Sequence, residues 1–87
     1  MNFVDAQEMV KVHPETFYAP SKDELDDISI GDFVKVCDND ERFWVIVEEI
    51  DGDTITGVVD NDLIRDHSFS CGSKISFDKC NVYNILS

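Results

Sequence analysis

The chain has 87 residues, of which 43% are hydrophobic, and it carries a formal net charge of −12 at pH 7. A chain of this length builds one hydrophobic core, so we expect a single domain over residues 1–87, with a helix and connector in residues 1–30 and a β-barrel core in residues 31–87. The composition excludes an intrinsically disordered chain, and the apolar runs are far shorter than the ~20 residues of a membrane-spanning helix.

The acidic charge is confined to one segment. Residues 23–66 contain 15 of the 19 acidic residues and three basic ones, which gives 3 − 15 = −12, whereas the four acids and four lysines elsewhere cancel. A surface of this sign repels phosphate, so direct binding to nucleic acid or to an anionic membrane is disfavoured and a basic protein partner is favoured. The same charge is also explained by solubility alone.

The cysteines and the N-terminal sequence predict a cytoplasmic protein. Cys37, Cys71 and Cys80 are odd in number and are not closely paired, so we expect reduced thiols. The chain opens without the basic and apolar segments of a signal peptide.

The first predicted element is a helix over residues 2–12. Asn2 is expected to cap it, and Asp5 lies in the first turn, where an acid interacts favourably with the helix dipole. His13 precedes Pro14 and therefore ends the helix. The helix is expected to cover one opening of the sheet with a stripe of apolar residues, Phe3, Ala6, Met9 and Val10.

A connector follows the helix. Phe17 and Tyr18 are expected to anchor it to the core. Ser21 and Glu24 have the spacing of a capping box, which predicts a single helical turn.

The remainder of the chain has the pattern of β-strands. Five strands are expected, over residues 32–38, 42–50, 54–60, 74–77 and 82–86. The second is apolar on both faces through Val47, which predicts a central strand packed on each side. Together these elements predict an α+β protein, mainly β, with a short N-terminal helix and a small SH3-like, partly open barrel of about five antiparallel strands.

Two turns are predicted, at Asn39-Asp40 and at Asp51-Gly52. The second has the signature of a two-residue hairpin loop and fixes a register. Gly57 in this register permits a close approach of two backbones or a bend. The pairs implied are Ile50–Asp53, Ile46–Gly57 and Arg42–Asn61.

The sequence predicts no metal site, no cofactor and no enzymatic activity. Acids around Asp38 approach the spacing of a calcium-binding loop, but Arg42 and Phe43 occupy positions that require a ligand and a glycine. A zinc site would need His67 and the three cysteines, which lack the close spacing of zinc motifs. No recognised catalytic motif includes His67.

The candidate binding residues lie at the polar ends of the central hairpin. They are Glu41, Arg42, Trp44, Asp60, Asn61, Asp62 and His67. The predicted register brings Arg42 beside residues 60–62, so charge-assisted hydrogen bonds there would hold the rim of the barrel. The sequence leaves this structural role and a binding role open.

Five stretches resemble a family of small bacterial and viral domains of unknown function, the YegJ type, which is related to immunity proteins of polymorphic toxin systems. The stretches are residues 13–17, 31–36, 41–45, 52–62 and 71–77. The family pattern usually has Gly-Asp where this chain has Gly72-Ser73. The resemblance implies a compact β domain and, for some relatives, neutralisation of a toxin by direct binding.

Three functions are therefore hypotheses. The first is a non-enzymatic protein-binding module whose acidic face docks a basic protein, as an immunity or inhibitor protein does. The second is a ligand- or metal-binding accessory domain that uses the rim around Trp44 and His67. The third is a nucleic-acid mimic that occupies the basic groove of a DNA-binding protein. The sequence does not indicate an oligomeric state.

Overall fold

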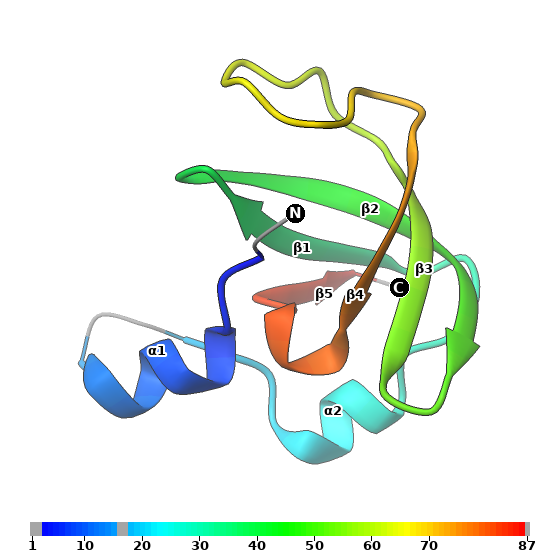
Figure 1. Ribbon diagram of the computed structural model, residues 1–87. Coiled ribbons are helices and arrows are strands. Elements are labelled where there is room, and N and C mark those ends of the chain that lie inside the picture. The colour runs from blue at the N-terminus through cyan, green and yellow to red at the C-terminus, as the bar shows by residue number, and fades with distance from the viewer. Residues whose placement is uncertain (1–2, 16–17, 87) are drawn as a thin grey trace.

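A computed structural model describes residues 3–15 and 18–86. It contains one antiparallel sheet in the order β4-β3-β2-β1-β5, with two short helices and a 3-10 turn at one side in Figure 1. The elements are α1 (Ala6–Val12), α2 (Lys22–Asp26), β1 (Phe33–Asp38), β2 (Glu41–Asp51), β3 (Thr54–Val59), β4 (Lys74–Asp78), η1 (Lys79–Asn81) and β5 (Asn84–Leu86). The expected class, α+β and mainly β with five antiparallel strands, is confirmed.

The sheet is curved but not closed into a barrel. β4 and β5 form its two edges, and within the described residues they pair with β3 and β1 rather than with each other. The predicted barrel is therefore an open sheet, and β2 is its central strand as predicted.

The first helix begins later than predicted. Asp5 is the N-cap, and its side chain accepts a hydrogen bond from the Glu8 amide at 3.0 Å. Residues 3–5 are not helical, and the Val4 amide donates to the Cys37 carbonyl at 3.1 Å. The predicted cap Asn2 lies outside the described residues. The predicted end at His13 is confirmed, since His13 is the C-cap.

The connector and α2 agree only in part with the predictions. The capping box of Ser21 and Glu24 is confirmed. Tyr18 does not anchor the connector in the core, because it is 62% exposed and its hydroxyl lies 3.4 Å from a Glu24 carboxylate oxygen. Phe17 lies outside the described residues.

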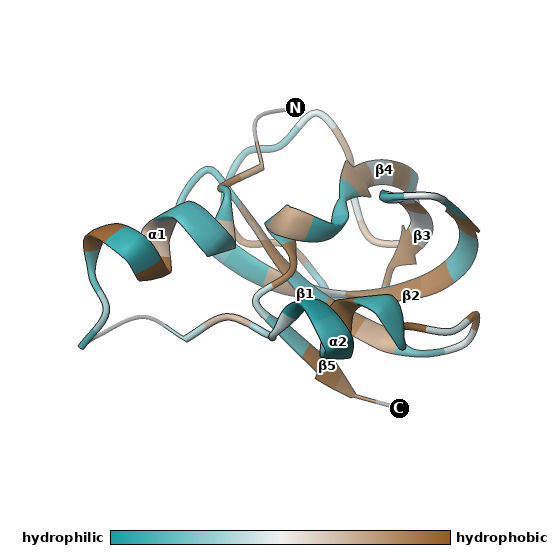
Figure 2. Cartoon of the chain, turned by 90° about the horizontal axis from the view of Figure 1, so that it is seen from below, coloured by the Kyte–Doolittle hydropathy of each residue, from teal (hydrophilic) through white to brown (hydrophobic). Residues whose placement is uncertain are grey.

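The core fills the inner face of the sheet. Hydrophobic residues are concentrated in the strands, whereas α2 is mainly hydrophilic (Figure 2). Phe3 belongs to this core rather than to a helical stripe, and its ring contacts those of Phe43, Phe69 and Phe77. The largest fully buried side chains are Phe43, Ile55, Val34, Val36, Val45, Val47, Val59 and Val82.

The register of the β2–β3 hairpin differs from the prediction because the two-residue loop is Gly52-Asp53 rather than the predicted Asp51-Gly52. β2 also contains a β-bulge at Glu48, which reduces the shift from two residues at the turn to one beyond the bulge. Val47 pairs with Gly57, but the next pair is Glu49 with Thr56. The bulge has a clear physical reason. Val47 and Ile50 both pack into the core although they are three residues apart, and one extra residue between them makes this possible. The observed pairs include Ile46–Val58, Ile50–Ile55 and Asp51–Thr54, so Gly52 and Asp53 form the loop.

The predicted close approach at Gly57 is confirmed, although its partner is Val47. A Cβ atom at this position would lie 2.4 Å from the Ile46 carbonyl oxygen and 2.5 Å from a methyl carbon of Val45. Only glycine fits here without a shift of the neighbouring strand.

Candidate functional site: a clamped loop beside an apolar sheet face

The tight turn between β1 and β2 presents two carboxylates to the β3–β4 loop. Asn39 and Asp40 have φ values of 50° and 58°. These are left-handed conformations that Asn and Asp tolerate better than most residues. The turn pairs Asp38 with Glu41 across the strands, so their side chains lie next to each other at the end of the hairpin.

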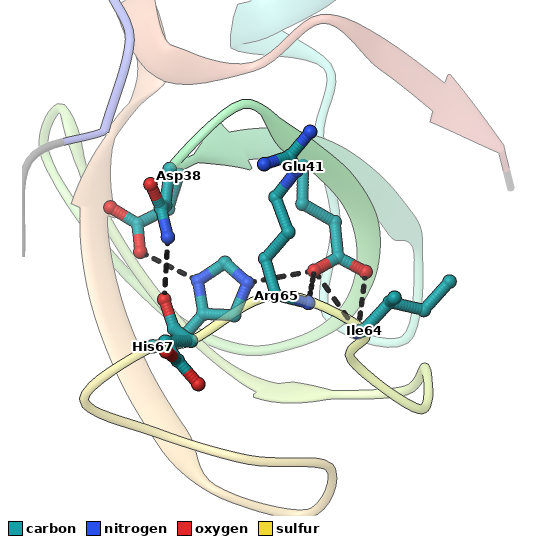
Figure 3. A network of polar contacts seen from close by, with 7 residues as sticks. Asp38, Glu41, Ile64, Arg65 and His67 are labelled. Carbon is teal, nitrogen blue, oxygen red and sulfur yellow. Dashed lines mark hydrogen bonds and ion pairs between the residues drawn. The ribbon is translucent and has the colours of Figure 1, made fainter.

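His67 lies between these two carboxylates (Figure 3). Its Nδ1 is 2.7 Å from Asp38 Oδ2, and its Nε2 is 2.8 Å from Glu41 Oε1. The side chain is fully shielded from solvent, with the rings of Phe43 and Phe69 at 5.8 and 5.1 Å between centroids. We call the three polar residues the His67 clamp.

The same turn also binds the backbone of the loop. Glu41 accepts hydrogen bonds from the amides of Ile64, at 3.0 and 3.1 Å, and Arg65, at 2.9 Å. The Asn39 side-chain amide donates to the Asp66 carbonyl at 2.8 Å. Residues 64–67, four consecutive loop residues, are thus held by the β1–β2 turn, and Figure 3 shows the bonds of Ile64, Arg65 and His67 meeting at the Glu41 carboxylate.

The contacts of the His67 clamp favour the charged forms of Glu41 and His67. The hydrogen bond from His67 and the two backbone amides lower the pKa of Glu41 from 4.5 to about 2. The hydrogen bonds to Asp38 and then to Glu41 raise the pKa of His67 above 6.5. An imidazolium donates from both ring nitrogens, which is what two flanking carboxylates require. Because both nitrogens are already bound, the ring positions the loop rather than offering a nitrogen to a ligand.

The structure brings some of the predicted site residues together. Glu41 and His67 are in direct contact. Trp44 and Asn61 also meet, because the Trp44 amide donates to the side-chain oxygen of Asn61. The amide of Asp60 donates to the Trp44 carbonyl at 2.9 Å.

The predicted pairing of Arg42 with Asn61 is wrong. Arg42 pairs with Cys37 of β1, and its guanidinium lies 4.8 Å from the centre of the Tyr83 ring. The loop at Gly52-Asp53 shifts the register by two residues at the turn and the bulge takes one back, so the Asn61 side chain bonds to the Trp44 amide instead. Asp60 and Asp62 are exposed.

Asp38 and Asn39 also belong to this site, although they are not among the candidate residues predicted from the sequence. A signal for Asp38 was present, since residues that flank a two-residue hairpin turn face each other across the strands. Asp38 and Glu41 flank Asn39-Asp40 in this way. Their meeting with His67 was not predictable from local pattern, because His67 lies 29 and 26 residues away in the chain.

The cysteines lie in different parts of the fold. Cys37 is buried beside Ala6 and Tyr83, whereas Cys71 is exposed, with its Sγ atom 3.8 Å from the Val59 carbonyl oxygen. Cys80 is half-buried in η1 and, like the other two, is a free thiol. Over residues 3–15 and 18–86, no three His, Cys, Asp or Glu side chains are grouped so as to hold a metal ion.

The face of the sheet opposite the core is unusually apolar. Phe33 and Val58 flank Ile46 as its cross-strand neighbours, and Trp44 follows on the same face of β2. These four residues are half-buried, and Leu86, which pairs with Phe33, is 54% exposed. A solvated face of an antiparallel sheet is ordinarily polar. The predicted packing on both sides of β2 is therefore incomplete, and we call these five residues the outer sheet face.

No family model, curated protein or solved structure matches the chain. The resemblance to YegJ-type domains thus rests on the five sequence stretches and stays a prediction. No helix in the described part of the chain has the length and apolar character needed to cross a bilayer.

Proposed function

We propose that the protein is a non-enzymatic, cytoplasmic protein-binding module that docks a basic protein through its acidic surface, as an immunity protein or inhibitor does. The observation that carries this proposal is where the charge lies. Among the acidic residues that the structure describes, Asp38 alone is buried, so nearly all of the negative charge is on the surface. A surface potential of one sign steers an oppositely charged protein and repels others.

The acids reach both ends of the sheet. Lysines neutralise little of this charge. Lys74 and Lys79 lie 3.5 and 3.6 Å from Glu48 and Asp26, and both carboxylates stay about half exposed. The exposed acids include Asp23 and Asp27 near α2, Asp51 and Asp53 at the β2–β3 turn, and Asp60, Asp62 and Asp66 in the β3–β4 loop.

The clamped loop supports a binding role. Its backbone is held at Ile64 by Glu41, yet Ile64 itself is 92% exposed. A loop that is fixed before a partner arrives loses less conformational entropy on binding. An exposed apolar side chain on such a loop is a suitable anchor for a protein partner.

The test is to co-express the chain with each protein encoded by a neighbouring gene and to measure complex formation with the purified proteins. We expect a stable complex with a basic protein. The double variant Asp60→Lys with Asp62→Lys should weaken it by about tenfold or more, because two acids become repulsive.

A control with the same change in charge is Glu8→Lys with Glu15→Lys, outside the acidic segment of residues 23–66. It should leave affinity within about twofold, since screened charges remote from an interface contribute little. A partner that is acidic, or one that binds all these variants equally well, would contradict the proposal.

A further inference from the structure

A groove lies beside the outer sheet face at the β-bulge, and Ile46 belongs to both. Its volume is about 520 Å³, and its walls include Ile30, Ile46, Glu48, Glu49 and Lys74. Ile30 is 71% exposed, although it lies beside the central strand, where the Gly31 amide bonds to the Val47 carbonyl. The groove thus combines aliphatic surface with two consecutive carboxylates.

The bulge is the reason why both carboxylates lie here. In a regular strand Glu48 and Glu49 would point to opposite faces. The extra residue keeps both exposed, while Val47 before them and Ile50 after them pack against the core. Lys74 approaches Glu48 at 3.5 Å, but the two side chains are 67% and 46% exposed, so a partner's cation displaces this lysine at little cost.

Trp44 offers a second feature for cations on the same face. The Lys35 ammonium already lies 4.9 Å from the centre of its ring. The ring face therefore accepts a positive charge in this geometry. Lysine and arginine side chains have an aliphatic stem and a cationic head. The stem matches the aliphatic surface of the groove, and the head matches its carboxylates.

We propose that the outer sheet face and its groove are the docking surface for a basic segment of a partner protein. A lysine or arginine of that segment lays its stem on Ile30 and Ile46 and places its head between Glu48 and Glu49, while the segment continues along β2 over Trp44, on the other side of Ile46. The inference rests on the proposed function and names the surface that performs it. A second copy of this chain does not fit, because two molecules of net charge −12 repel each other.

Trp44 is the single tryptophan of the chain, so its fluorescence reports occupation of this face. The probe is a short synthetic peptide of alternating lysine and leucine, with a lysine–serine and a glutamate–leucine peptide as controls. We expect the lysine–leucine peptide to shift Trp44 emission to shorter wavelength in a saturable manner. The lysine–serine peptide should bind at least about tenfold more weakly, since it lacks apolar contact, and the glutamate–leucine peptide should have no effect.

Matched charge reversals locate the site. The double variant Glu48→Lys with Glu49→Lys should weaken binding of the lysine–leucine peptide by about tenfold or more. The control variant Asp23→Lys with Asp27→Lys makes the same change of charge at α2. It should weaken binding of the lysine–leucine peptide by less than about threefold. Circular dichroism confirms that each variant is folded.

Calorimetry separates the two ways of failing. Two results would overturn the docking surface while leaving the basic-partner proposal in place. The first is binding of the lysine–leucine peptide without a change in Trp44 emission. The second is an equal loss of peptide affinity in the two double variants. Absence of binding by both cationic peptides would contradict the basic-partner proposal as well.

Discussion

At the scale of single residues, His67 connects the two hairpin strands to a loop that is distant in sequence. Asp38 from β1 and Glu41 from β2 are the charged groups that face its ring, and Phe43 and Phe69 shield it from solvent. Arg65 and Asp66 precede it in the same loop, and their backbone groups are bound by the turn. Both ring nitrogens donate only while the imidazole is protonated, so the clamp is complete only in that state.

This arrangement predicts a limited pH range of full stability. The raised pKa of His67 makes its contribution complete below 6.5, and that contribution is lost as the pH rises through the folded-state pKa. The pKa of Glu41 is lowered from 4.5 to about 2, so its contribution is present above pH 4.5 and is lost as the pH falls toward 2. The clamp should stabilise the fold most between pH 4.5 and 6.5.

The measurement compares melting temperatures of the wild type and His67→Gln across pH. Glutamine stays polar but cannot carry the charge, so the variant should melt about 5 °C lower within this range, with a smaller difference in alkaline solution. Ser68→Ala, an exposed neighbour in the loop, serves as the control and should follow the wild type. A difference that does not change with pH would show that His67 acts only by packing.

At the scale of elements, Gly57 determines how closely β2 and β3 approach. Gly57→Ala should destabilise the fold by about 1–3 kcal/mol, because the added methyl group overlaps the Ile46 carbonyl and Val45. Chemical denaturation gives the free energy of unfolding. Thr54→Ala, at an exposed position in the same strand, should cost less than about 1 kcal/mol. A Gly57→Ala variant as stable as the wild type would mean that the strands are not this close.

The strands were predictable from sequence because alternation and turn chemistry are local properties. These patterns predict the central position of β2, the turn at Asn39-Asp40 and the capping box of α2, and the structure confirms all three. The predicted loop at Asp51-Gly52 is wrong by one residue, since Asp51 still pairs with Thr54. The bulge was missed, since residues 42–50 were interpreted as an uninterrupted strand. Two consecutive glutamates between inward-facing Val47 and Ile50 were the available signal.

The site was less predictable than the elements. Seven candidate residues were named, and the structure joins Glu41 to His67 and Trp44 to Asn61. The role predicted for Arg42 depends on the register of a loop at Asp51-Gly52, whereas the loop is formed by Gly52 and Asp53. Contacts of the loop with the β1–β2 turn depend on tertiary packing, which no local pattern encodes.

At the scale of the whole molecule, charge and apolar surface together define the proposed role. Acids on the surface attract a basic protein from a distance, whereas the outer sheet face and the exposed Ile64 supply contact area once it arrives. Electrostatic attraction of this kind acts mainly on the association rate, and apolar anchors act mainly on the dissociation rate. The two contributions can therefore be measured separately.

The most direct test is the salt dependence of complex formation with the basic partner, followed by stopped-flow fluorescence of Trp44. The account predicts that the association rate constant falls by about tenfold or more as NaCl rises from about 0.02 to 0.5 M, while the dissociation rate constant changes little. An association rate that does not depend on salt would contradict it.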